Sequence, residues 1–209
     1  ATPWAQSNPT HLEIQSAPHL RRARCTPSTD QACDYPYLIV AREEQNGSAT
    51  RTTLSSMKAI LSALGIVVVL AYAIGSGIWV NTGDNWYANL NAPSWQPPDF
   101  VFGIIWPYNF IVLGIAAVTI AQRATTTTSA IFLSFFTASV VCALTWAYQF
   151  YRPHNLQAAS LALALTAVLT VPLIVIAFRT STAIGVALLP YQIWVITAAV
   201  LSSSYARLN

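Results

Sequence analysis

The chain has 209 residues, of which 55% are hydrophobic and only 8% are charged, with 10 Lys and Arg against 7 Asp and Glu. A soluble domain carries about 25% charged residues, so this composition excludes an ordinary water-soluble enzyme. The basic groups are few and thinly spread, and they form no basic face for phosphates, which argues against a nucleic-acid partner.

The first 56 residues form a polar arm that is rich in Pro, Thr and Ser and has no sustained apolar period. Such a segment buries too little apolar surface to offset the entropy of ordering, so we expect an arm that is disordered or held by a partner. The chain begins with Ala1, and its single Met is Met57. The arm is therefore either retained after removal of a targeting peptide or lies upstream of a true start at Met57.

Two cysteines of the arm, Cys25 and Cys33, are eight residues apart. They are spaced to close a small disulfide loop in an oxidising compartment. A zinc site is not expected, because no third and fourth ligand lie nearby.

Residues 57–209 contain seven charged residues, and these separate long charge-free stretches. Each stretch exceeds the roughly 20 apolar residues that cross a bilayer as a helix. We therefore predict an all-α, polytopic integral membrane protein whose domain at 57–209 is a bundle of five transmembrane helices. The composition suits a bacterial and an organellar membrane equally. The predicted spans are about 58–80, 101–121, 129–150, 156–178 and 182–202.

Apart from Lys58 at the very start of the first, none of the predicted spans contains Asp, Glu, Lys or Arg. Ion-driven transporters keep ionisable groups at depth, so this class is not expected. The loop residues Asp84, Asp99 and His154 are too few for a catalytic set or a metal cluster, and no enzymatic activity, metal or required cofactor is predicted. Asp99, after Pro98, is interpreted as a helix N-cap. His154 is interpreted as a polar loop residue, with axial ligation of haem as the alternative.

Aromatic residues gather in the connection after the first span and along the second, third and fifth spans. The connection runs from Trp86 to Pro98, and its prolines stiffen the backbone. In the second span, Phe102, Trp106 and Phe110 recur every four residues and share one helix face. Two interpretations stay open: ordinary packing between helices, and an aromatic-lined interior for a flat apolar ligand. Further rings recur at Trp146 and Phe150, and at Tyr191, Trp194 and Tyr205.

This pattern of rings, prolines and glycines resembles a known family. The residues that carry it are Trp86, Tyr87, Leu90, Pro93, Ser94, Trp95, Pro97, Pro98, Phe102, Gly103, Trp106 and Gly114. They resemble the first-loop and second-helix signature of the TspO/MBR family, the translocator and tryptophan-rich sensory proteins once called peripheral-type benzodiazepine receptors. Leu189-Pro190-Tyr191 with Trp194 is similar to the fifth-helix motif of that family. The resemblance covers residues 58–209 and leaves the arm outside.

The resemblance implies a five-helix bundle, often a homodimer, with a ligand pocket under the first loop. Relatives bind tetrapyrroles such as porphyrin and haem, sterols and benzodiazepine-site ligands, and transport and stress sensing have been proposed for them. The implied function is a membrane receptor or binding protein for such flat apolar ligands. The ligand-binding residues implied by the family are Trp86, Tyr87, Trp95, Phe102, Trp106, Trp146, Tyr191 and Trp194.

Two further assignments concern the ends of helices. Leu201, Tyr205 and Arg207 match a sterol-recognition pattern that also occurs in many unrelated helices. Arg152 and Arg207 are hypothesised to pair with a ligand carboxylate such as a porphyrin propionate. The alternative is that both arginines anchor helix ends to lipid headgroups.

The chain departs from the family pattern at three polar positions. Ala143 stands where the third helix usually has Asn, Ser202 where the fifth usually has Asn, and Phe110 where the second usually has Tyr. Polar groups that orient ligands in relatives are therefore missing, which leaves the identity of the ligand open.

A second hypothesis is an accessory structural subunit of a membrane complex, docked through the arm. A third, porphyrin breakdown in the pocket, lacks a general acid or base. Small residues at Ser134, Ala138 and Cys142, and at Ala71 and Gly75, suit close helix contacts either inside the bundle or between two copies.

Overall fold

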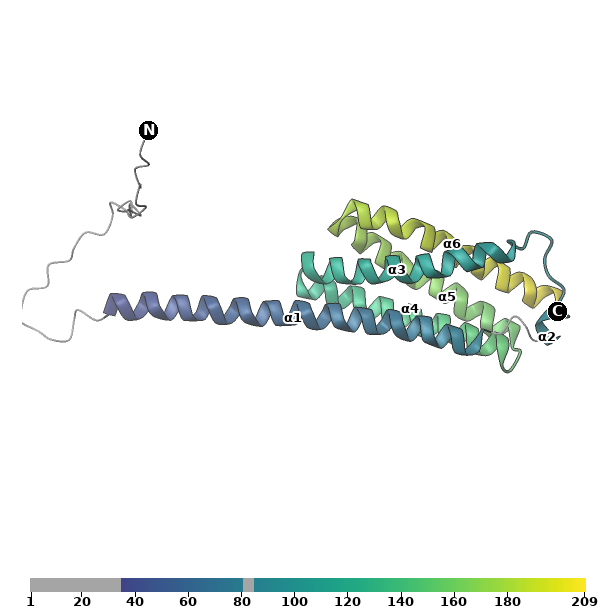
Figure 1. Ribbon diagram of the computed structural model, residues 1–209, viewed down its shortest axis with the longest axis horizontal. Coiled ribbons are helices and arrows are strands. Elements are labelled where there is room, and N and C mark those ends of the chain that lie inside the picture. Colours follow the sequence, from purple (N-terminus) through teal and green to yellow (C-terminus); the bar gives the residue numbers. More distant parts are fainter. Residues whose placement is uncertain (1–34, 81–84) are drawn as a thin grey trace, which may run out of the picture. The chain divides into compact units, whose positions relative to one another are not determined.

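The computed structural model describes residues 35–80 and 85–209, with side chains from Ser48 onward. The chain divides into two units, residues 1–48 and 49–209, and the second unit holds the membrane domain. None of the described residues forms a strand. The helices of the described part are α1 (Tyr35–Trp79), α2 (Asn85–Ala88), α3 (Asp99–Arg123), α4 (Thr126–Tyr151), α5 (Leu156–Thr180) and α6 (Thr182–Leu208) (Figure 1).

In the described part of the chain, five helical segments are long and apolar enough to cross a membrane. These segments are Ser48–Trp79, Asp99–Arg123, Thr126–Tyr151, Leu156–Thr180 and Thr182–Leu208. They coincide with the five predicted spans. The first segment starts earlier and ends one residue sooner than predicted, and the other four are two to six residues longer. The all-α, multi-pass fold predicted from the charge-free stretches is therefore confirmed.

The helix of the first span begins earlier than the sequence predicted. Residues 35–56, which were expected to belong to a mobile arm, are helical and continue into the first span. Extending an existing helix adds one hydrogen bond per residue fixed, whereas starting a new one is costly. The polar sequence after Pro36 contains no further proline, so the helix formed by the apolar span can propagate backwards through it. The predicted loop of Cys25 and Cys33 lies outside the described residues.

Three of the connections between helices are short, which makes consecutive helices antiparallel neighbours. Only Ala124 and Thr125 separate α3 from α4, and the Thr125 hydroxyl caps α4 by accepting a hydrogen bond from the Thr128 N–H at 3.2 Å. The Asn155 side chain caps α5 in the same way, from the Ala158 N–H at 3.1 Å. The long connection, between α1 and α3, carries the short helix α2.

Contacts between the helices place α6 beside α3 and α5, and α5 beside α4, while α3 also touches α4 and α5, and α1 lies against α3 and α4. On one side of α1, a Cβ built on Gly65 would lie 2.7 Å from the Cβ of Ala117 in α3. On the other side, a Cβ on Gly75 would lie 2.7 Å from a methyl carbon of Leu144 in α4. Glycine at these two positions lets α1 approach both neighbours closely. Gly75 therefore serves contacts within the bundle, while Ser134 and Ala138 of the other small-residue stripe are exposed.

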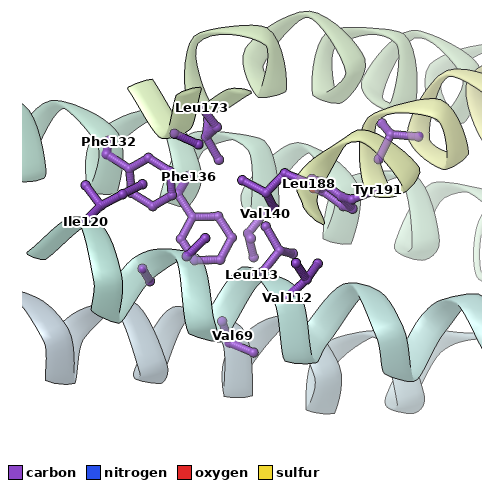
Figure 2. Close-up of a cluster of buried hydrophobic side chains, with 14 residues drawn as sticks. Val69, Val112, Leu113, Ile120, Phe132, Phe136, Val140, Leu173, Leu188 and Tyr191 are labelled. Atoms are coloured by element: carbon purple, nitrogen blue, oxygen red, sulfur yellow. The ribbon is translucent and has the colours of Figure 1, made fainter. Parts of the chain in front are cut away.

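The end of the bundle beside the α3–α4 connection has a filled centre, which we call the packed half. Large side chains from four helices meet there without exposure: Leu113, Phe136, Leu173, Leu188 and Tyr191 (Figure 2). Ala116 and Ala177, both fully buried, let these large groups approach one another. Such close packing without voids is typical of protein interiors.

Candidate functional site

The other end of the bundle contains a partly open cavity of about 610 Å³, and we call this part the hollow half. Its walls come from α1, α3, α4 and α6, with Tyr87 from α2 and Leu163 from α5. The volume lies within the range of about 300–1,000 Å³ that small-molecule sites occupy. The lining aromatic residues are Tyr72, Tyr87, Phe102, Trp106, Phe110, Trp146, Phe150, Tyr151, Trp194 and Tyr205.

The part of the cavity nearest the packed half is walled by rings of α1 and α3. The ring centroids of Tyr72 and Phe110 lie 5.3 Å apart in an edge-to-face arrangement, and Trp106 lies 5.8 Å from Phe110. Phe102, one turn before Trp106, contacts Trp194 of α6 edge to face at 5.0 Å. These spacings are those that aromatic pairs prefer, so the rings hold one another in place around the space.

The part of the cavity nearest the connection between α1 and α3 is lined by three tyrosines. The ring of Tyr87 lies 5.9 Å from that of Tyr151 and 6.2 Å from that of Tyr205. The Tyr205 hydroxyl donates a hydrogen bond to Oε1 of Gln96, which ties the connection to α6. A second tie joins the Asn91 N–H to Oδ1 of Asn209 at 2.8 Å. The connection is therefore fastened over this end of the bundle.

Five of the eight ligand-binding residues implied by the family line the cavity: Tyr87, Phe102, Trp106, Trp146 and Trp194. The other three do not. Tyr191 is only 1% exposed and belongs to the packed half. Trp95 is 45% exposed. Trp86 stacks face to face on His154, with ring centroids 3.7 Å apart. Whether any of the eight touches a ligand stays a prediction.

The residues at the helix ends lie outside the cavity lining. Arg152 is an exposed residue at the end of α4, and Arg207 lines a separate groove of about 280 Å³ beside α5 and α6. Their predicted pairing with a ligand carboxylate stays a prediction, without support from the lining. In the sterol pattern, Leu201 and Tyr205 face the cavity, whereas Arg207 faces elsewhere. The three residues therefore do not share one surface.

Sequence reasoning missed several lining residues. Tyr72 and Ser76 of α1 line the cavity. Their spacing of four residues places them on one face of the helix, but it does not show whether that face points to the cavity or to lipid. Asp99 was interpreted as an N-cap, but the N-cap of α3 is Pro98 and Asp99 is the first helical residue. One turn before Phe102 on the same helix face, Asp99 lines the cavity.

The cavity also contains polar groups that a ligand can use. Oγ of Ser202 and Nε1 of Trp146 are buried and have no hydrogen-bond partner among the described residues. A buried polar atom without a partner costs free energy, which a hydrogen bond to a ligand would recover. Within the described residues, no group of three or more His, Cys, Asp and Glu is placed to hold a metal ion. The arrangement suits binding by shape, ring contacts and a few hydrogen bonds.

Comparison with known proteins agrees with this architecture. A family model described as the TspO/MBR family matches residues 63–208. An uncharacterized membrane protein of Bacillus subtilis, YtaB, is 31% identical over 157 residues, which cover 73% of this chain and 99% of the relative. The tryptophan-rich sensory protein of Cereibacter sphaeroides is 33% identical over 131 residues, 60% of this chain and 78% of the relative. The protein CrtK of Rhodobacter capsulatus is 30% identical over 125 residues, 59% of this chain and 78% of the relative.

Proposed function

Because the chain belongs to the TspO/MBR family, we propose that its cavity binds a flat, largely apolar ligand: a tetrapyrrole such as porphyrin or haem, or a molecule of similar shape such as a sterol. The protein is an integral multi-pass membrane protein in contact with the lipid bilayer, and its relatives include a tryptophan-rich sensory protein. A sensory or binding role in the membrane follows from that membership. The nature of the ligand is our proposal.

The observation that carries the proposal is the ring-walled cavity. Phe102, Trp106 and Trp194 present large apolar faces and edges to a space of about 610 Å³. Small residues on the opposing helices, Ala73 and Gly77 of α1 and Ala198 of α6, leave the middle open. A flat ring system placed there would exchange water contact for aromatic contact, which is the largest favourable term available in a site with few polar groups.

The lining also bears on whether the tetrapyrrole needs to carry iron. Of the side chains that usually ligate haem iron, His, Cys and Met are absent from the described lining, whereas Tyr is present. Recognition through the ring faces requires no iron, so a metal-free porphyrin is the sharper probe. The proposal includes no chemical conversion of the ligand.

The test is a spectral titration of the purified protein with protoporphyrin IX, comparing the wild type with Trp106→Ala and Trp194→Ala. Both variants remove a ring from the cavity wall, and we expect each to weaken binding by about tenfold, since a lost ring contact in a pocket costs on the order of 1–2 kcal/mol. Trp95→Ala is the matched control, because it removes the same ring from a position outside the lining. Equal effects of all three substitutions, or unchanged spectra with the wild type, would overturn the proposal.

A further inference from the structure

The cavity lining carries a negative charge, which would repel a porphyrin propionate placed beside it. Among the described lining residues, Asp99 is the only one with a charged side chain. No hydrogen bond or ion pair joins its carboxylate to another described residue. Its carboxylate belongs to the first turn of α3.

Several aromatic side chains line the cavity together with Asp99. Phe102 follows Asp99 by three residues on the same face of α3. Tyr205 is hydrogen-bonded to Gln96, which lies three residues before Asp99 in the chain. Tyr87 and Tyr151 line the same end of the cavity. The faces of aromatic rings attract cations within about 6 Å of their centres. A carboxylate among such rings is the combination that recognises an ammonium group.

The backbone of α3 adds an acceptor to the same wall. Gly103, one turn after Asp99, lines the cavity, and nothing lies within 4 Å of the place where its Cβ would be. Pro107 has no N–H and cannot donate the usual helical hydrogen bond to the Gly103 carbonyl. The Gly103 carbonyl therefore lacks its usual helical donor and is, like the carboxylate, an acceptor for N–H groups.

The arginines, by contrast, do not balance this charge. Neither Arg152 nor Arg207 belongs to the cavity lining. A ligand that carries carboxylates at the end near the connection would meet Asp99 with a like charge, which disfavours binding. A ligand that carries a cation there would find an opposite charge and several rings.

We propose that the cavity selects ligands with a flat apolar body and a cationic amine, protonated or quaternary, at the end beside Asp99. This inference rests on the proposed function, since it names the chemical class of the ligand for the same cavity. The body lies between the rings of α3 and α6, and the ammonium lies among Asp99, Tyr87 and Tyr205. The polar end of the ligand thus faces the connection, and its apolar end faces the packed half.

The experiment uses three probes with one ring system: protoporphyrin IX, its dimethyl ester, and its bis-amide with N,N-dimethylethylenediamine, which carries two ammonium groups. Each is titrated into the full chain in nanodiscs of zwitterionic lipid, because anionic headgroups would themselves attract the ammonium. We expect the wild type to bind the ammonium probe about fivefold more tightly than the ester, and the free acid most weakly. Added salt should reduce these differences.

Variants of Asp99 identify the source of the preference. Asp99→Asn should clearly reduce the preference for the ammonium probe over the ester, whereas Asp99→Glu should retain it. Arg207→Gln is the matched control: it changes the net charge by one unit outside the lining and should leave the order of the probes unchanged. Since Asp99 is exposed, both substitutions are expected to leave the fold intact, and the ester serves as the measure of a functional cavity.

The outcomes separate this inference from the proposed function. Binding of the ester without any preference for the ammonium probe would overturn the selection for cations and leave the tetrapyrrole site standing. A preference that Asp99→Asn leaves undiminished would also overturn it. Failure of all three probes to bind the wild type would overturn the proposed function itself.

Discussion

The packed half and the hollow half of the bundle are built from the same transmembrane helices, yet one has a filled centre and the other contains a partly open cavity. In the packed half, bulky side chains such as Leu113, Phe136 and Leu188 reach the centre from different helices (Figure 2). In the hollow half, the rings stand mainly on α3 and α4, while α1 and α6 add small residues such as Ala73 and Ala198 between their own rings.

The difference shows that helix periodicity alone does not produce a cavity. Both halves follow the same apolar repeat, and both contain aromatic residues. What differs is whether large side chains from opposing helices meet or are matched with small ones. A rigid ring cannot bend to fill the gap left by a small neighbour, so the space between walls persists where several rings face Ala, Gly and Ser.

The largest expected effect contrasts one aromatic residue from each half. Phe136→Ala removes a ring with 0% exposure from the packed half and should destabilise the protein by about 3–5 kcal/mol. Trp106→Ala should cost less, because its side chain already borders an open space and loses fewer contacts. Thermal unfolding in detergent, followed by tryptophan fluorescence and circular dichroism, measures both. Similar losses would mean that the cavity wall is packed as tightly as the core.

A medium effect is expected where two helices approach through glycine. Gly65→Ala places a methyl group 2.7 Å from the Cβ of Ala117, so α1 and α3 must separate. Alanine also has a higher helix propensity than glycine, which offsets part of this cost, and we expect a net destabilisation of about 1–2 kcal/mol. Gly103→Ala, in the hollow half, meets nothing within 4 Å and should be neutral or stabilising by up to about 1 kcal/mol. Thermal unfolding of both variants tests the contrast, which would fail if Gly103→Ala proved the more damaging.

The smallest expected effect concerns the connection that is fastened over the hollow half. Tyr205→Phe removes the hydroxyl that binds Gln96 and should cost about 1 kcal/mol, felt locally. Hydrogen exchange at residues 85–98 should therefore speed up by about fivefold while the packed half stays unchanged. Tyr148→Phe is the matched control, since Tyr148 is 46% exposed and does not belong to the cavity lining. Equal acceleration in both variants would show that the bond does not hold the connection.

The sequence by itself determined the class of the protein and the number of spans. Charge-free stretches bounded by residues such as Lys58, Arg123 and Arg179 have no stable place except across a bilayer, and this holds whatever the helices pack against. The spacing of Phe102, Trp106 and Phe110 likewise fixed one face of α3, because the helical repeat places residues four apart on the same side. That face does line the cavity.

Only the tertiary structure decided which rings share a space. Periodicity gives the direction of a side chain relative to its own helix axis, but not the rotation of that helix against its neighbours or the level at which they meet. Tyr191 thus lies in the packed half although it is one turn before Trp194, Trp95 points away from the lining, and Asp99 enters it. These placements depend on contacts between residues far apart in the chain, such as Tyr205 with Gln96, which no local pattern encodes.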